Sequence, residues 1–161
     1  DQEEEARFAL QNPDLYDGDS AGIDVAFVVD RLAISGDRFR WPNALVPYSI
    51  DASLSDKAAL IKRGMNDYLK NTCVKFVPRT TEANNVKIFK GQGCNSYVGK
   101  INGQLALSLG IGCHYVGTIV HELGHALGFF HEQSSSDRAE HLIIYLENVS
   151  ICMQSNFQKL R

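Results

Sequence analysis

The chain has 161 residues, a length that fits one domain with a sizeable core and is short for two domains. Apolar residues make up 44% and charged residues 22%, which argues against a disordered protein. The net charge of −3 gives no basic surface for nucleic acid or an anionic membrane, and no apolar run approaches the roughly 20 residues that a membrane span needs. No basic-then-apolar signal sequence opens the chain, so we expect either a cytosolic protein or one from which such a segment has been removed.

The front forty residues are acidic and rich in turn residues, and the first regular element predicted after them is a strand at 45–50 ("LVPYSI"). A helix is expected to start near Ser55 or Asp56, because apolar side chains then recur on one helical face. These side chains are Ile61, Met65, Tyr68 and Leu69. Three short β-rich runs follow, at 74–77, 86–89 and 105–109. A second helix is expected from near Gly117, and this order of elements indicates a mixed α/β or α+β layer.

The cysteines and one short triplet bear on the cellular compartment. The four cysteines are Cys73, Cys94, Cys113 and Cys152. No two of them form a CxxC pair, which argues against a structural zinc knuckle or a thioredoxin-like motif. Two disulfides in an oxidising compartment fit this pattern, with three connectivities open. Because Asn148-Val149-Ser150 is also an N-glycosylation acceptor pattern, these features together favour secretion.

The stretch "HELGHALGFFHE" (121–132) falls on the second predicted helix. His121 and His125 are four residues apart, so both imidazoles lie on one helical face, about 6 Å apart along the axis. Gly128 is placed to end the helix in a left-handed conformation, after which the chain can return and bring His131 to the same metal. The two phenylalanines at 129–130 are expected to anchor this turn in the core.

Three imidazoles are ligands suited to zinc, and three protein ligands leave a position open for water, which is typical of a catalytic site. Glu122, next to the first ligand, is expected to act as general base on a zinc-bound water, so that the reaction is peptide-bond hydrolysis. The alternative is a buried amphipathic helix with incidental histidines. The full H-E-x-x-H-x-x-G-x-x-H pattern is far more specific than H-E-x-x-H alone and favours the zinc site.

With Glu132 directly after the third histidine, the motif resembles that of the astacin family of secreted zinc endopeptidases, within the metzincins. Collinear matches cover most of the chain: "RWPN", "VPYSI", "NTCVKFVPRTTE", "GCNSYVG", "LSLGIGC", "DR" and "ENV". The resemblance implies an α+β, metzincin-type (zincin-like) domain with a twisted mixed sheet packed on two helices. It implies one zinc ion per chain, held by His121, His125 and His131, with Glu122 as general base and acid. Glu132 would be the buried acid that pairs, through water, with the N-terminal amine of the mature protein.

The resemblance also gives the front segment a role. The residues at 16–19, "YDGD", resemble the propeptide motif F-x-G-D, in which the last aspartate, here Asp19, occupies the zinc position that water needs and keeps the enzyme latent. A plain Asp-Gly turn is the alternative explanation of these four residues. "DRLAISGD" resembles the activation region, which implies cleavage after Arg31 by a trypsin-like protease. Residues 1–31 would then be the propeptide and 32–161 the N-terminal part of the catalytic domain, with Arg38 and Arg40 as competing cleavage sites.

Cys94 and Cys113 match a disulfide of the family, which would contribute roughly 3 kcal/mol by the loop-entropy model. Cys73 matches a cysteine whose partner lies near the end of the family's domain. A Cys73–Cys152 bridge and two free thiols both stay open.

By the same resemblance, the Met-turn and its tyrosine should follow residue 161, so the C-terminal subdomain is expected to be largely missing. Met153 and Tyr145 do not fit those roles, and Ser135 stands where the family has arginine. His114 and His141 are not expected to be ligands.

Two functions follow. The first is a secreted, latent zinc endopeptidase that acts on protein or peptide substrates. The second is a truncated, astacin-like protein that binds zinc without catalysis. A gluzincin with a distant glutamate as third ligand is disfavoured, because Gly128 and His131 stand where metzincins need them.

Overall fold

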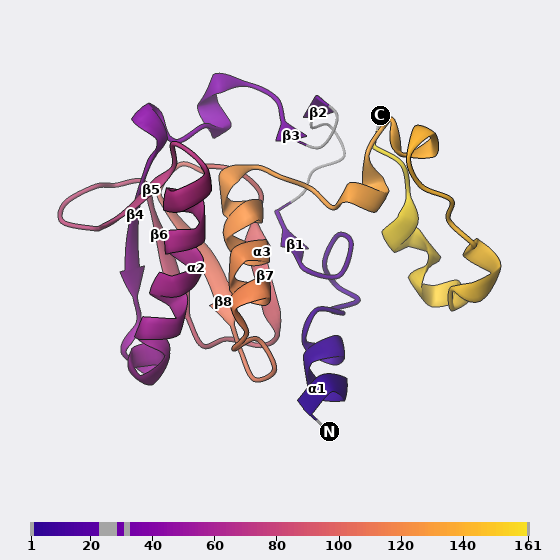
Figure 1. The fold of residues 1–161 in the computed structure, drawn as a ribbon, viewed down its shortest axis with the longest axis horizontal. Helices are drawn as coiled ribbons and strands as arrows, with labels where there is room; N and C mark the ends of the chain where they lie inside the picture. Colours follow the sequence, from indigo (N-terminus) through magenta and orange to yellow (C-terminus); the bar gives the residue numbers. More distant parts are fainter. Residues whose placement is uncertain (1, 23–28, 31–32, 161) are drawn as a thin grey trace.

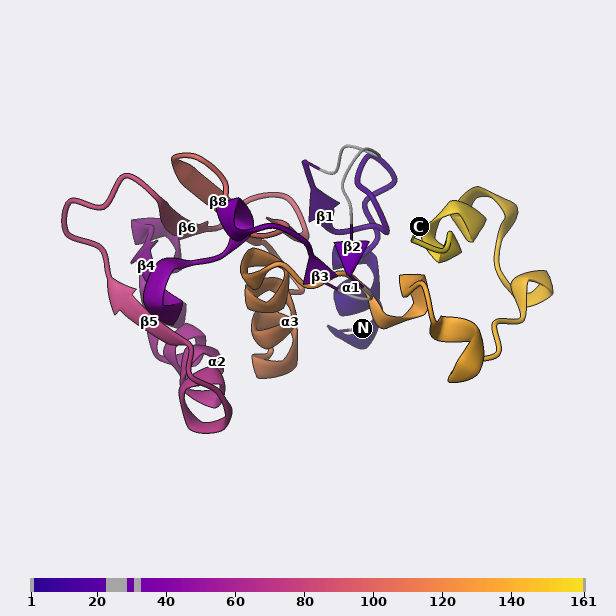
Figure 2. The same cartoon turned by 90° about the horizontal axis from the view of Figure 1, so that it is seen from above.

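The computed structural model describes residues 2–22, 29–30 and 33–160 and has a six-stranded mixed sheet at its centre (Figure 1). In sheet order its strands are β1 (Ser20–Ala21), β7 (Cys94–Tyr97), β8 (Gln104–Leu109), β6 (Asn85–Phe89), β4 (Leu45–Ile50) and β5 (Lys75–Pro78). The β7–β8 pair is antiparallel and every other pair in this sheet is parallel. Helices α2 (Ala58–Asn71) and α3 (Val116–Leu127) lie side by side on one face (Figures 1 and 2), so the expected α+β fold with a twisted mixed sheet on two helices is confirmed.

Helix α2 follows the predicted apolar pattern with two differences. Ile61 and Met65 are buried as predicted, but Leu69 is 50% exposed because it lies at the edge of the apolar face. The helix also begins at Ala58, later than predicted, because a 3-10 turn over Ala52–Lys57 precedes it. Its contact with α3 is close at Gly64, where a Cβ atom would lie 2.7 Å from Ile119 Cγ2. Glycine therefore sets the distance between the two helices.

The front segment contains a helix, α1 (Gln2–Ala9), that the turn-rich composition did not predict. Its last residue, Ala9, is buried in the main core, and the helix backbone packs so closely that a Cβ on Gly112 would lie 2.7 Å from Glu5 O. The chain then turns and enters β1, which pairs in parallel with β7 through Ser20 and Ser96. The segment is thus added to the sheet as a strand on its β7 side.

A second, two-stranded sheet consists of β2 (Val29–Asp30) and β3 (Ala33–Ile34), which pair antiparallel. The expected cleavage site between Arg31 and Leu32 lies outside the described residues.

Residues from 129 on form short 3-10 turns beside the front segment, on the side of the molecule away from β4 and β5 (Figures 1 and 2). The turns are Glu132–Ser134, Arg138–Glu140, Leu146–Asn148 and Ile151–Phe157. The "ENV" match falls on the turn Leu146–Asn148, where no strand pairs with the chain among the described residues. No helix in the described part of the chain is long and apolar enough to cross a membrane.

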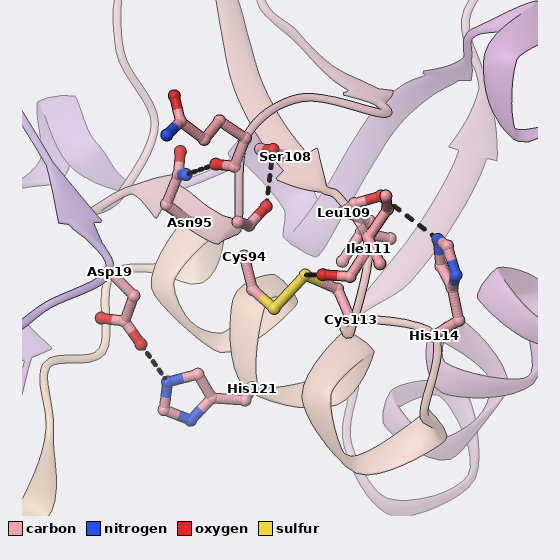
Figure 3. The surroundings of a disulfide bond; sticks show 11 residues. Asp19, Cys94, Asn95, Ser108, Leu109, Ile111, Cys113, His114 and His121 are labelled. Carbon is pink, nitrogen blue, oxygen red and sulfur yellow. Dashed lines mark hydrogen bonds and ion pairs between the residues drawn. A yellow bond between two sulfur atoms is a disulfide. The ribbon is translucent and has the colours of Figure 1, made fainter. Parts of the chain in front are cut away.

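The main core fills the space between the sheet and the two helices, and two links join α3 to the rest of the domain. Trp41 donates its indole N–H to Ala126 O at 2.8 Å. A disulfide joins Cys94, at the start of β7, to Cys113, before α3, as the resemblance implied (Figure 3). Cys73 and Cys152 are free and exposed, so the structure has free thiols at these two positions and no bridge between them.

Candidate metal centre

Helix α3 places two of the histidines. His121 and His125 lie one turn apart, with their Nε2 atoms 3.0 Å from each other. His125 is buried, and its Nδ1 lies 2.8 Å from Phe129 O, a carbonyl that can only accept a hydrogen bond. Nδ1 therefore carries a proton that it donates to this carbonyl, and Nε2 faces His121.

The third histidine reaches the site through the turn at Gly128. This residue has φ 110° and ψ 11°, and its N–H bonds the carbonyls of Gly124 and His125, so the helix ends in the left-handed conformation that the sequence predicts. The chain then becomes extended and brings His131 Nε2 to 3.0 Å from His121 Nε2.

The two phenylalanines of this turn differ from the prediction that both anchor it in the core. Phe130 is buried beside Ile34 and Val98, whereas Phe129 is 50% exposed. Successive side chains of an extended segment point to opposite sides, so only one of the two can face the core. The prediction is therefore right for Phe130 and wrong for Phe129.

The three imidazoles fit a metal ion better than they fit one another. Each Nε2 faces another imidazole nitrogen at about hydrogen-bond distance, and no more than one nitrogen of such a pair can donate to the other, so the contacts among the three rings leave lone pairs directed at one another. With a carboxylate oxygen of Asp19, the three nitrogens form a group of four donor atoms that all lie within 4.8 Å of one another. Borderline-soft nitrogen ligands with one oxygen, converging on one point, suit zinc.

Asp19 comes from the front segment and contacts all three histidines. Its carboxylate oxygens lie 2.9 Å from His121 Nε2, 3.3 Å from His125 Nε2 and 3.1 Å from His131 Nε2. Figure 3 shows the contact with His121. Burial opposes the charged carboxylate, but hydrogen bonds from the three imidazoles outweigh this cost and hold the pKa of Asp19 far below its usual range. The main chain fixes its position, because Ser96 N–H donates to Asp19 O at 3.0 Å.

Glu122 lies next to this group with no partner of its own. Its side chain is fully buried, and neither Oε1 nor Oε2 has a hydrogen-bond partner among the described residues. Burial, together with the negative charge of Asp19, raises the pKa of Glu122 to about 9, against an opposing effect of His131. A buried carboxyl with a high proton affinity beside a metal group is typical of a general base or acid.

Asp17 is a site residue that the sequence prediction did not single out, since it counted only as part of an Asp-Gly turn. Its Oδ2 lies 3.6 Å from His131 Nδ1 and accepts a hydrogen bond from Ser134 Oγ at 2.6 Å. Burial lowers the pKa of His131, but the close carboxylates of Asp17 and Asp19 and their negative charges outweigh it and raise that pKa to about 9. The second acidic residue in "YDGD" is the feature of the sequence that could have indicated this contact.

The remaining candidates lie outside the metal group. Glu132 begins a 3-10 turn and is exposed, so the burial expected for it is not present here, and its role stays a prediction. His114 Nε2 lies 3.3 Å from Leu109 O (Figure 3), and His141 is exposed. Neither belongs to the group of donor atoms found in the described part of the chain.

A helix with two histidines, a glycine turn and a third histidine that returns to them are typical of metzincin-type zinc-binding domains, and the chain has all three features. Within that class the chain belongs to the astacin family: the peptidase family described as "Astacin" matches residues 33–161. The family resemblance inferred from the motifs is thereby confirmed, and its members are zinc metalloendopeptidases.

The relatives show how far the likeness extends. The chain is 44% identical over 148 residues to "Astacin-like metalloprotease toxin 1" of Loxosceles intermedia, covering 91% of this chain and 56% of that protein. It is 44% identical over 128 residues to "Blastula protease 10" of Paracentrotus lividus, covering 74% of this chain and 21% of that protein. The solved structure of High choriolytic enzyme 1, a hatching enzyme zinc-protease from Oryzias latipes, superposes with a TM-score of 0.73 at 35% identity, covering 81% of this chain and 68% of that one. The chain therefore spans only part of the length of these relatives.

Proposed function

We propose that the chain is the latent form of a secreted, zinc-dependent endopeptidase that acts on protein or peptide substrates. One observation carries the proposal: the Asp19 carboxylate and the three imidazoles of His121, His125 and His131 form a single group of donor atoms. One zinc ion per chain would be held there by the histidines. Asp19 would take the fourth position, which an active zinc protease keeps for water.

The chain's own residues divide the chemistry between them. A zinc ion bound at this group would supply a Lewis acid that polarises the substrate carbonyl and makes water more acidic. Glu122 would accept the proton of the attacking water and pass it to the leaving amine. Its geometry supports this role, because a buried carboxyl whose two oxygens have no hydrogen-bond partner among the described residues is not occupied by another interaction.

Latency follows from where the front segment lies. Asp19 contacts the three histidines, and β1 pairs with β7, a strand that would otherwise offer an open edge to an extended peptide. Residues 1–31 would be the propeptide and 32–161 the catalytic part. Cleavage after Arg31 by a trypsin-like protease would release the segment, and the new amine at Leu32 would then pair with Glu132.

Secretion and glycosylation have separate support. The Cys94–Cys113 disulfide is fully buried, and disulfides persist in oxidising compartments. Asn148, in the acceptor triplet, is exposed at the end of a 3-10 turn, where a glycan meets no steric obstacle from the core.

The proposal is tested on purified chain by zinc analysis and by gelatin cleavage before and after trypsin treatment. We expect about one zinc per chain, no cleavage before treatment and cleavage after it. Glu122→Gln should keep the zinc and lose the cleavage, whereas His131→Ala should lose the zinc. A chain that holds zinc but never cuts would support the non-catalytic alternative, and a chain without zinc would refute both.

A further inference from the structure

Two carboxylates of the front segment lie on opposite sides of one imidazole. Asp19 contacts Nε2 of His131 at 3.1 Å, and Asp17 Oδ2 lies 3.6 Å from Nδ1 of the same ring. The Asp17 side chain is 1% exposed. Its Oδ1 and the His131 Nδ1 are both buried without a hydrogen-bond partner among the described residues. The 3.6 Å contact with Asp17 Oδ2 thus places a carboxylate beside the second nitrogen of this ring.

The backbone of the front segment makes this arrangement possible. Asp17 has φ +52°, a left-handed conformation that aspartate and asparagine adopt more easily than most residues. Gly18 follows with φ +91°, and a Cβ there would lie 2.8 Å from Leu10 O. Two successive residues with positive φ turn the chain between the two aspartates, and Asp17 and Asp19 reach the two different ring nitrogens of His131. Ser134 Oγ then fixes the Asp17 carboxylate at 2.6 Å.

We propose that Asp17 is a positioning residue that orients His131 from the side opposite to the metal. The proposal rests on the proposed function, since it concerns the third ligand of the same site. A histidine ligand needs a partner for its second ring nitrogen, which fixes the tautomer and the ring orientation. The second nitrogen of His125 faces Phe129 O, in the turn that directly follows α3, whereas the second nitrogen of His131 faces a carboxylate of the removable segment.

This difference has a consequence for activation. Release of the front segment removes Asp19 from the metal and also removes the partner of His131 Nδ1. Cleavage should therefore weaken zinc binding by more than the loss of the Asp19 contact alone would. The front segment thus stabilises the ligand set as well as blocking it.

The test measures how fast zinc passes from the uncleaved chain to an excess of chelator. Asp17→Asn keeps the size of the side chain and its tolerance of positive φ, but removes the charge. We expect zinc release about 10-fold faster, at the lower end for such partners, because the amide oxygen can still accept a hydrogen bond. The matched control is Asp14→Asn, an exposed aspartate of the same segment, which should release zinc like the wild type.

Two further measurements separate orientation from simple anchoring. Ser134→Ala removes the hydrogen bond to Asp17 and leaves the charge beside His131, so its effect on zinc release should be smaller than that of Asp17→Asn. In the zinc-loaded wild type, the NMR signal of the His131 Nδ1 proton should be protected from solvent exchange, and Asp17→Asn should reduce that protection. Unfolding with excess chelator checks that each variant is folded.

The outcomes also distinguish this proposal from the one on which it rests. If Asp19→Asn speeds zinc release while Asp17→Asn behaves like Asp14→Asn, Asp17 has no positioning role and the latent zinc site stands. If Ser134→Ala matches or exceeds Asp17→Asn, anchoring accounts for the contact and the positioning role is wrong. If the wild-type chain holds no zinc, the proposed function fails first.

Discussion

Gly128 determines where the third histidine lies, and its replacement by alanine should weaken the fold and the metal site together. The residue has φ 110° at the end of α3, three positions before His131. A Cβ there would lie 3.0 Å from Ile34 Cγ2, closer than ordinary van der Waals contact. An alanine at this position would therefore strain its own backbone and push against Ile34 of β3.

The two costs can be estimated separately. A left-handed conformation costs an L-residue about 1–2 kcal/mol. Forcing a methyl group into a packed site costs typically about 1–3 kcal/mol. We expect Gly128→Ala to lower the free energy of unfolding by about 2–5 kcal/mol in chelator. In zinc the loss should be larger, because any shift of the turn moves His131 away from His121 and His125.

Two other glycines serve as matched controls for this measurement. Gly103 also has positive φ, at 93°, but a Cβ there would meet nothing within 4 Å, so Gly103→Ala should lose only the backbone cost of about 1–2 kcal/mol. Gly117 lies inside α3 without positive φ and with the same open space, so Gly117→Ala should leave stability unchanged or raise it by up to about 1 kcal/mol. Denaturant unfolding with zinc and with chelator measures all three variants.

The comparison of the stability loss in zinc with the loss in chelator tests whether Gly128 places His131. Gly103→Ala should lose the same amount in zinc and in chelator, whereas Gly128→Ala should lose more in zinc. If Gly128→Ala behaves like Gly103→Ala and competes for zinc like the wild type, the glycine does not place His131, and the physical explanation of the motif is wrong.

Three other predictions concern the latch, the disulfide and the buried acid. Asp19→Asn should let the uncleaved chain cut a quenched peptide at least about 10-fold faster than the wild type, since a charge-assisted contact worth about 1.5–3 kcal/mol is lost; equal latency of the two chains would contradict this. Replacing Cys94 and Cys113 by serine should lower the free energy of unfolding by about 3 kcal/mol, because the bridge closes a loop with a sequence separation of 19; a loss below about 1 kcal/mol would count against the entropic estimate. In chelator, the wild type should lose stability relative to Glu122→Gln as pH rises from 5 to 9, because the folded pKa of about 9 lies above the unfolded value of 4.5 and ionisation inside the fold is penalised. A stability difference independent of pH would show that Glu122 is not desolvated in this way.

The helix that carries His121 and His125 was predictable because the determinants are local. The i, i+4 spacing of His121 and His125 and the glycine three residues later act within about two helical turns, and the structure has this helix and its end at Gly128 as expected. The strands of the sheet's centre were also predictable, since β4, β6 and β8 are short segments rich in apolar side chains, several of which are buried.

Features that depend on distant partners were not predictable. Strand β7 is short and half polar, and it pairs with β1, whose residues lie about 75 positions earlier in the chain. Helix α1 carries few apolar residues, and its backbone lies close to two glycines far away in the sequence, Gly93 and Gly112. The role of Asp17 depends on Ser134, 117 positions away in sequence. No local pattern encodes these contacts.

The three histidines differ in what holds them in place. His121 and His125 stand on a helix whose backbone fixes them, whereas His131 lies in a loop after a single glycine. That loop is bonded from both sides of the expected cleavage site: Asp17 and Asp19 contact His131 from before it, and Ile34 N–H donates to Gly128 O from after it, at 2.8 Å. Cleavage would remove the first set of contacts and leave the second. The ligand that the helix does not fix is thus the one whose surroundings would change most on activation, so an effect of the front segment on zinc binding should be sought at His131.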